Sequence, residues 1–251
     1  MRYAILSDIH SNLEALTAVL NSFATQHVDR YLCLGDVVGY GANPEACLDL
    51  LRRCEAASVC GNHDWACIGR FELNWFNDAA KRALLWTRDQ LGFSDLDYLR
   101  RLPPVLTEEL LTCVHGTLRH PERFEYLADV AQAVDVANAC RTLCCFVGHT
   151  HVPLVVEYDR RQERVLRVLT APSELAEVRL SNDPAQLRYV LNPGSVGQPR
   201  DGDPRASCAM LDTTAMAYSI QRISYDVATA QQKIRQAGLP NFLAERLAIG
   251  R

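Results

Sequence analysis

The stretch LCCFVGHTHVP, residues 143–153, places an apolar run directly before two histidines, His149 and His151. Near the N-terminus AILSDIHSN, residues 4–12, repeats this arrangement with Asp8 and His10. Short apolar runs bounded by polar or turn residues are typical of buried strands. Both stretches therefore predict a strand whose end carries polar side chains.

The same arrangement occurs three more times. The apolar runs Tyr31–Leu34, Ala57–Cys60 and Leu110–Val114 lead into GDVVGYG, GNHD and VHG. Between the first runs, Leu13–Phe23 and Pro44–Arg53 show helical spacing, and proline suits the first turn of a helix. This alternation of short strands and helices predicts an α/β fold.

The pattern changes after the third strand, because apolar residues recur at helical spacing from Trp65 to Arg101. We expect an insertion of two or three helices at about 66–104, within a single domain spanning 1–251. Beyond the strand expected at Thr142–Val147 the chain is β-rich, and a helix from Val227 to about Ala237 precedes a short last helix. The strands expected in this part are Leu154–Tyr158, Val165–Leu169, Tyr189–Leu191, Ser207–Leu211 and Tyr218–Ile223.

Composition narrows the classes of partner. The chain has 251 residues, 48% of them hydrophobic, and a formal net charge of -4. There is no basic block, which argues against broad nucleic-acid binding but leaves a small nucleotide substrate open. The N-terminus is typical of a strand rather than a signal peptide, and no apolar run is long enough to span a membrane, so no membrane partner is expected.

The ten cysteines are scattered, with no CxxC pair, and most lie in apolar runs. This pattern favours reduced, buried thiols in a cytoplasmic protein over a zinc–cysteine site. Cys144 and Cys145 are adjacent in a predicted strand, so their side chains should point to opposite faces of the sheet.

Polar residues collect where the predicted strands end. In open α/β sheets, ligands bind beyond the carboxyl ends of the strands. Five of the seven histidines lie there, and only His27 and His120 do not. The strand-end residues are Asp8, His10, Asp36, Asn62, His63, His115, His149 and His151.

Imidazole and carboxylate together suit first-row ions such as manganese, iron, zinc or nickel. The lack of cysteine in the set argues against a closed structural zinc site. The i, i+2 spacing of Asp8/His10 and of His149/His151 lets alternate side chains of an extended segment face the same way. About seven candidates exceed the needs of one ion, whereas two ions sharing a carboxylate would use them all.

The ordered blocks DIH, GD, GNHD, H and GHTH, from Asp8 to His151, resemble the calcineurin-like metallophosphoesterases. The longer stretches SDIHSNLEAL, GDVVGYGANP and NPGSVGQPR are similar to the bacterial and archaeal phosphodiesterase branch, which includes proteins related to diadenosine tetraphosphatase. The resemblance implies a four-layer αββα sandwich of two mixed sheets packed face to face, with helices outside.

The resemblance also implies residue roles. Asp8, His10 and His151 would hold one metal, and Asn62, His115 and His149 a second. Asp36 would bridge the two ions, and His63 would sit beside the leaving group as the catalytic acid. Two divalent ions, with Mn²⁺ expected and Fe, Zn, Ni or Co as alternatives, can activate a bridging hydroxide and clamp phosphate oxygens.

One block departs from the protein serine/threonine phosphatases of the same superfamily, which continue it as GDxxDRG. Here it is GDVVGYG, so the usual orienting carboxylate and a phosphate-binding arginine are missing, and the third block ends in Asp64 rather than glutamate. We therefore expect hydrolysis of small phosphodiesters or dinucleoside polyphosphates. The alternatives are a phosphomonoesterase, including a protein phosphatase, and a non-catalytic scaffold with this fold.

Several sequence features allow two interpretations each. NPGSVGQPR is either a turn-rich connection or a loop beside the metals that brings Arg200 to a substrate phosphate. Tyr40 and Asn43 are further candidates for lining the site. The three tryptophans, Trp65, Trp75 and Trp86, are expected to pack in the core, the alternatives being a lid that stacks a nucleobase or a surface for a homo-oligomer.

Overall fold

The computed structural model describes all residues, 1–251, and contains two six-stranded mixed sheets. Sheet 1 has the order β3-β2-β1-β11-β12-β9 and sheet 2 the order β4-β5-β6-β10-β7-β8. The strands of sheet 1 are β1 (Arg2–Leu6), β2 (Arg30–Cys33), β3 (Ala57–Ser58), β9 (Val178–Arg179), β11 (Ala206–Asp212) and β12 (Ala217–Ile223). Those of sheet 2 are β4 (Val105–Thr107), β5 (Leu111–Val114), β6 (Cys144–Phe146), β7 (Leu154–Asp159), β8 (Arg164–Leu169) and β10 (Leu187–Asn192).

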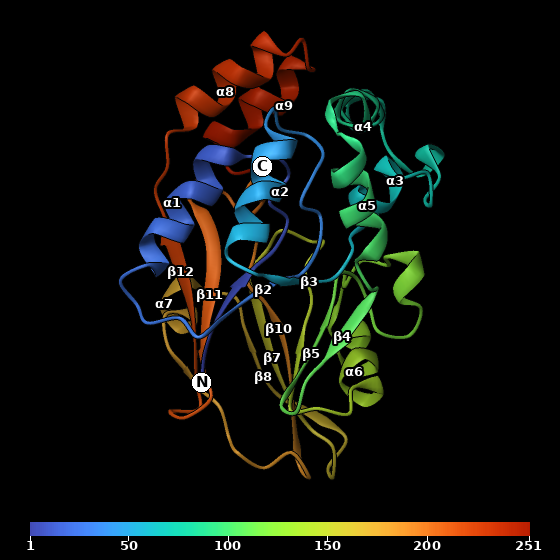
Figure 1. Ribbon diagram of the computed structural model, residues 1–251. Helices are drawn as coiled ribbons and strands as arrows, with labels where there is room; N and C mark the ends of the chain where they lie inside the picture. The colour runs from blue at the N-terminus through green and yellow to red at the C-terminus, as the bar shows by residue number, and fades with distance from the viewer.

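Both sheets combine parallel and antiparallel pairs. In sheet 1, β1 runs parallel to β2 and antiparallel to β11, so Ile5 lies opposite Leu32 on one side and Ala209 on the other. In sheet 2, β6 runs parallel to both β5 and β10, whereas β10 and β7 are antiparallel. The strands β1, β2, β3, β5 and β6 precede the five polar blocks, and their carboxyl ends lie at the same end of the molecule (Figure 1).

Alternation along the strands creates separate cores. Tyr3 and Ile5 join a cluster with side chains of sheet 2, including Phe146, whereas Ala4 and Leu6 join the cluster on the outer, helical face of sheet 1. The two sheets therefore pack face to face. Cys144 belongs to the core between the sheets and Cys145 to the cluster outside sheet 2, which confirms their predicted opposite orientation.

Helices cover both outer faces, as the four-layer prediction requires. On sheet 1 lie α1 (Leu13–Phe23), α2 (Pro44–Arg53) and α8 (Val227–Gln236), and on sheet 2 lies α6 (Val130–Ala139) (Figure 1). The bounds of α1 and α2 are those predicted. The side chain of Asn12 caps α1 by accepting a hydrogen bond from the backbone N–H of Ala15.

The predicted helical insertion comprises α3 (Asn62–Cys67), η1 (Leu73–Trp75), α4 (Asp78–Gln90) and α5 (Phe93–Arg101). These helices project beside the carboxyl ends of the strands (Figure 1). Trp65 and Trp86 are partly buried against the core, but the side chain of Trp75 is 78% exposed. The expectation of core packing is therefore wrong for Trp75.

Four elements are not predicted by the apolar pattern of the sequence. They are α6, which Asp129 caps, the strands β4 and β9, and the short helix α7 (Pro172–Leu175). The remaining short helices are η2 (Pro121–Arg123), α9 (Asn241–Glu245) and η3 (Arg246–Ala248). No helix combines the length and the hydropathy that crossing a bilayer requires.

Candidate metal centre

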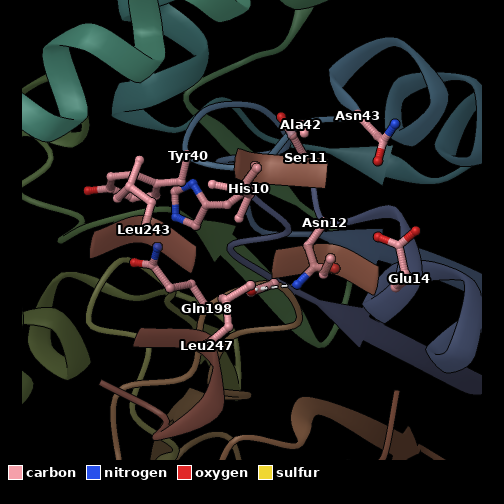
Figure 2. A pocket seen from close by; sticks show the side chains of 14 residues that line it. His10, Ser11, Asn12, Glu14, Tyr40, Ala42, Asn43, Gln198, Leu243 and Leu247 are labelled. Atoms are coloured by element: carbon pink, nitrogen blue, oxygen red, sulfur yellow. Dashed lines mark hydrogen bonds between the residues drawn. The ribbon is translucent and has the colours of Figure 1, made fainter. Parts of the chain in front are cut away.

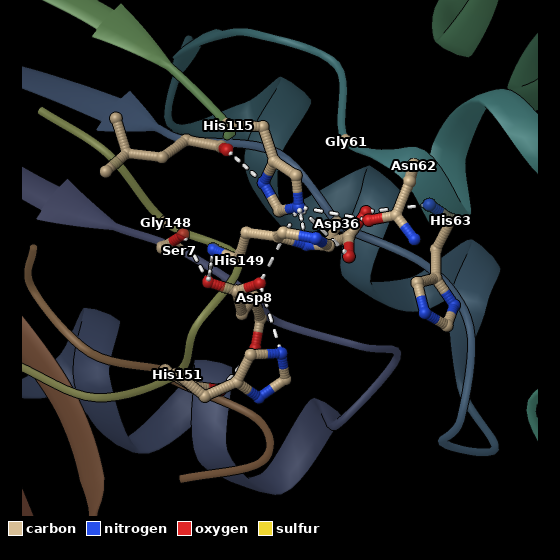
Figure 3. A network of polar contacts seen from close by, with 12 residues as sticks. Ser7, Asp8, Asp36, Gly61, Asn62, His63, His115, Gly148, His149 and His151 are labelled. Atoms are coloured by element: carbon tan, nitrogen blue, oxygen red, sulfur yellow. Dashed lines mark hydrogen bonds and ion pairs between the residues drawn. The ribbon is translucent and has the colours of Figure 1, made fainter. Parts of the chain in front are cut away.

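The candidate metal ligands and His63 converge where β1, β2, β3, β5 and β6 end (Figure 3). Asp8 follows β1, Asp36 follows β2, and His115 follows β5. His149 and His151 follow β6, and all of these side chains are buried. The GNHD block is not a loop as expected, because Asn62 and His63 form the first turn of α3.

Asp8, His10 and His151 form the first group. A backbone carbonyl can only accept a hydrogen bond, so His10 donates through Nδ1 to Val38 and His151 donates through Nδ1 to Gln198. The two Nε2 atoms therefore carry lone pairs, yet they face each other at 3.2 Å. Asp8 Oδ1 lies 3.3 Å from His151 Nε2 and has no hydrogen-bond donor.

The second group contains His115, His149 and Asn62. His115 donates through Nδ1 to the carbonyl of Leu34 at 2.7 Å, which turns its Nε2 towards the site. This nitrogen lies 3.1 Å from Nδ1 of His149 and 3.2 Å from Oδ1 of Asn62. Nitrogen and oxygen acceptors thus converge here as well.

Asp36 lies between the first and the second group. Its Oδ2 lies 3.3 Å from Nε2 of His115 and 3.7 Å from Nε2 of His10. Its Oδ1 accepts the backbone N–H of His63 at 2.8 Å, which fixes the direction of Oδ2. Asp36 can therefore share one oxygen between two cations, one in each group.

This arrangement fits divalent cations. Lone pairs of buried nitrogens and oxygens that meet without protons repel one another, and a cation converts the repulsion into coordination. A proton on His115 offsets part of this repulsion. Burial opposes ionisation of His115, but the carboxylates of Asp36 and Asp8 raise the pKa of His115 to about 9. Burial and neighbouring histidines hold the pKa values of His10 and His149 well below the usual range. A bound metal would take the place of the proton on His115.

The backbone of the ligand loops is strained. Seven of the twelve non-glycine residues with positive φ lie here: Asp8, His10, Ser11, Asp36, Tyr40, His149 and His151. Their φ values lie between 49° and 67°, in the left-handed region. The expectation that Asp8/His10 and His149/His151 lie on extended segments is therefore wrong, since left-handed turns orient these side chains. Such residues each cost about 1–3 kcal/mol and persist only where the surroundings hold them.

The carboxylate of Asp64 provides much of that support. It accepts the backbone N–H groups of Asp36, Val37, Val38 and Gly61 at 2.9–3.2 Å. Burial and the nearby Asp36 carboxylate raise the pKa of Asp64 to about 7. The sequence does not indicate this role of Asp64, because three of its four partners lie in the loop that follows β2.

The NPGSVGQPR loop provides the rest of the support. Ser195 donates its hydroxyl to the carbonyl of Asp8 at 2.8 Å, and the N–H of Gly197 donates to the same carbonyl at 3.0 Å. The carbonyl of Gln198 accepts from His151 at 2.6 Å. The loop therefore lies beside the candidate ligands and holds two of them, Asp8 and His151, in place.

Comparison with known proteins agrees with this geometry. Residues 1–216 match the calcineurin-like phosphoesterase superfamily domain. A protein of Methanocaldococcus jannaschii described as uncharacterized is 40% identical, over 99% of this chain and 98% of its own length. The crystal structure of a metallophosphoesterase from Sphaerobacter thermophilus is 43% identical and covers 100% of this chain and 99% of its own, with a TM-score of 0.85.

This chain belongs to the calcineurin-like phosphoesterase superfamily. It is a metal-dependent phosphoesterase, a hydrolase that acts on phosphoester bonds, as the resemblance of the sequence blocks implied. A putative diadenosine tetraphosphatase shares the fold alone, at 17% identity and a TM-score of 0.51, covering 89% of this chain and 94% of its own.

In this phosphoesterase His63 lies beside the ligands without an orienting carboxylate. Its ring centroid is 4.4 Å from that of Tyr40, 4.8 Å from that of His10 and 4.9 Å from that of Phe76. Its Nδ1 is buried without a hydrogen-bond partner, and Gly39, at φ 92°, abuts this nitrogen so closely that a Cβ would collide with it. Burial, only partly offset by Asp36, lowers the pKa of His63 to about 4.

A cavity of about 310 Å³ opens from the ligands. Tyr40 and Arg200 line it together with Asp36, Asn62, His63, His149 and His151. Its other walls contain aromatic residues that sequence reasoning did not connect with the site: Phe71, Trp75, Phe76, Phe124 and Tyr126. Arg200 donates from Nη2 to Oε1 of Gln198 at 2.9 Å, and its Nε is buried without a partner.

Asn43 does not reach this cavity. It stands at the N-cap of α2 and lines a separate narrow crevice of about 10 Å³ between His10 and the C-terminal helices (Figure 2). The side chain of Asn43 points away from the ring of His10 in this view. Of the three predicted substrate contacts, the structure therefore brings only Tyr40 and Arg200 to the cavity that contains the ligand groups.

Proposed function

We propose that this phosphoesterase binds two divalent metal ions and hydrolyses small phosphodiesters or dinucleoside polyphosphates. The observation that carries the proposal is the position of Asp36. Its Oδ2 faces Nε2 of His10, which carries a lone pair, and Nε2 of His115, whose proton a metal would replace; the two histidines belong to different groups. One oxygen between two sets of lone pairs suits a carboxylate bridge between two cations.

Asp8, His10 and His151 would hold the first ion, and Asn62, His115 and His149 the second. When bound, the two ions supply a water of lowered pKa and positive charge for the phosphate oxygens. The carbonyls of Val38, Leu34 and Gln198 fix the imidazoles so that a bare nitrogen faces each ion.

His63 and Arg200 act on the substrate rather than on the metals in this proposal. The guanidinium of Arg200 lines the cavity, has no carboxylate partner and can contact a phosphate oxygen. His63 lines the same cavity and can supply its ring proton to the leaving oxygen. Geometry also groups His63 with His10 and Asp36 as a candidate ligand set, so the metal content of a His63 variant is a required measurement.

The substrate ranking follows from the phosphate-binding groups. The arginine and the orienting aspartate of protein phosphatases are absent, and Gly39 lies against the ring of His63 instead. The cavity is small and walled by aromatic side chains, which suits a compact substrate better than a phosphopeptide.

A substrate panel with a metal titration tests the proposal. The purified protein is stripped, reloaded with Mn²⁺, Fe²⁺, Zn²⁺, Ni²⁺ or Co²⁺, and analysed for metal content. We expect two ions per chain, Mn²⁺ supporting the highest activity, and aryl phosphodiesters or dinucleoside polyphosphates turned over faster than phosphoserine peptides. A single ion at saturation would contradict the dinuclear centre, and a preference for the peptides or for simple monoesters would reverse the substrate ranking.

The proposed location is the cytoplasm. All ten cysteines are free thiols, and nine of them are buried. Unpaired thiols in this number are typical of a reducing compartment.

A further inference from the structure

The cavity has two chemically different ends. One end carries the metal-ligand candidates and Arg200, which suit a phosphate. The other end is formed by side chains from two separate segments, the helical insertion and the loop between β5 and α6. We call this end the aromatic wall; it consists of Phe71, Trp75, Phe76, Phe124 and Tyr126.

Two rings of the wall are open to solvent. Trp75 is 78% exposed and Tyr126 is 52% exposed, although both line the cavity. Large aromatic rings left open beside a polar site are available to a ligand. Tyr126 stacks on His149, with ring centroids 3.8 Å apart and an interplanar angle of 23°, so its exposed surface begins directly beside a candidate metal ligand.

The other three rings of the wall, Phe71, Phe76 and Phe124, are connected by edge-to-face contacts. Phe71 meets Phe124 edge-to-face at 5.3 Å and Phe76 at 5.9 Å, which joins the two segments. Phe76, buried next to Trp75, contacts His63 edge-on at 4.9 Å. The ring contacts therefore extend from His63 to Phe76, the neighbour of the exposed Trp75 in the chain.

The backbone of the loop between β5 and α6 is strained where it carries the aromatic wall. Phe124 has φ 51°, a conformation that is a clear outlier for a bulky residue. Its ring nevertheless packs against Phe71 and, at 5.2 Å, against Trp65. Strain of this kind persists where surrounding contacts over-determine it, here those that place the Tyr126 segment against the ligands.

We propose that the aromatic wall is a base-binding subsite, in which Trp75 and Tyr126 offer stacking surfaces to the nucleobase of one nucleotide of the substrate. The inference rests on the proposed function and adds the class of substrate: nucleoside phosphoesters rather than simple alkyl phosphoesters. A volume of about 310 Å³ suits one nucleotide unit, not a peptide or a folded nucleic acid. Arg200 lines the same cavity and matches the charge of the phosphate. Arg123 also lines it, but its charge is offset by Glu125, whose Oε1 lies 3.9 Å from Nη1 of Arg123.

Stacking on an aromatic side chain is tolerant of base identity, so the subsite selects for the presence of a base. Trp75 and Tyr126 act as specificity-determining residues in this proposal. A phosphate without a base would bind through Arg200 and the metals alone. We therefore predict different affinities for two probes that share a sugar phosphate but of which only one carries a base.

The test compares AMP with ribose 5-phosphate on the metal-loaded protein, by calorimetry and by inhibition of bis(4-nitrophenyl) phosphate turnover. We expect AMP to bind roughly 5- to 150-fold more tightly, the range that one stacked base contributes. Trp75→Ala should remove most of this difference and leave the affinity for ribose 5-phosphate unchanged. Phe93→Ala is the matched control, because Phe93 is an aromatic residue of the same insertion, 81% exposed, that does not line the cavity.

Equal affinities of the two probes in the unmodified protein would overturn the subsite, even if phosphodiesters are hydrolysed. So would a Trp75→Ala variant that weakens both probes alike. If Trp75→Ala instead dissociates an oligomer while the preference for AMP stays intact, a second copy of the chain covers Trp75 and the proposal is wrong. The protein could instead prefer AMP in a way that depends on Trp75 and yet hydrolyse no phosphoester with any metal. That result would support the subsite and refute the proposed function.

Discussion

The ligand loops and the aromatic wall line the same cavity but are built in different ways. The ligand side chains are buried, carry strained backbones and are fixed by hydrogen bonds to distant carbonyls. The wall is partly exposed and is held by edge-to-face contacts between rings. Under our two proposals the loops carry the chemistry and the wall selects the substrate. Changes in the loops should abolish turnover, whereas changes in the wall should alter preference.

Asp36→Asn should have the largest effect. An amide carries less charge and cannot bridge two cations as a carboxylate does, so the metal content should fall below two per chain. We expect kcat to fall roughly 10⁴-fold or more for every substrate, since metal activation of water and charge stabilisation are lost together. Elemental analysis and steady-state rates measure this. If the Asp36→Asn variant keeps two ions and near-normal rates, Asp36 is not the bridge.

His63→Ala separates catalysis from metal binding within the ligand loops. If His63 supplies a proton, both metals should stay bound while the rate on a poor leaving group falls ~10²–10⁴-fold. The loss should be smaller for nitrophenolate, which needs little protonation. His115→Ala is the matched control, because removal of a ligand should empty a metal position and slow all substrates alike. Metal loss from His63→Ala, or equal slowing of both substrates, would make His63 a ligand instead.

Asp64→Ala tests how the strained loops are held. The variant leaves the buried N–H groups of Asp36, Val37, Val38 and Gly61 without their acceptor. We expect a loss of about 3 kcal/mol in the free energy of unfolding, and thus a Tm lower by roughly 6–12 °C, measured by denaturation of the metal-free protein. Asp64→Asn, which keeps one acceptor oxygen, should lose less. An unchanged Tm would mean that other contacts hold these loops.

Arg200→Ala should have the smallest effect on rate, because Arg200 is proposed to contact the substrate phosphate and not the metals. Loss of a charge-assisted phosphate contact should raise KM about tenfold and change kcat little. Arg205→Ala, on the same segment but paired with Asp203 and not lining the cavity, is the control. Unchanged kinetics of Arg200→Ala would leave NPGSVGQPR with only the structural contacts that it makes to Asp8 and His151.

Much of the fold and of the site was predictable because the signals are local. An apolar run followed by a polar block marks the end of a strand, and α1 and α2 follow from helical spacing and from Pro44. Asp8, Asp36, His115 and His151 were identifiable because their residue types suit metals and their blocks come in order. Asn43 is also a polar residue next to one of the blocks, yet it stands at the N-cap position of α2, outside the cavity.

Residue type and spacing within short segments were enough to identify the family, the four-layer architecture and the candidate ligands. Which acceptor atoms meet depends instead on the folded chain, because left-handed turns at Asp8 and His149, not extended strands, orient them. The support that Asp64 gives to the loop of Asp36 and the contact of Phe71 with Phe124 also arise only on folding. These contacts join residues on different elements, and no local pattern specifies them, because strand pairing and ring packing across the sheet ends bring them together.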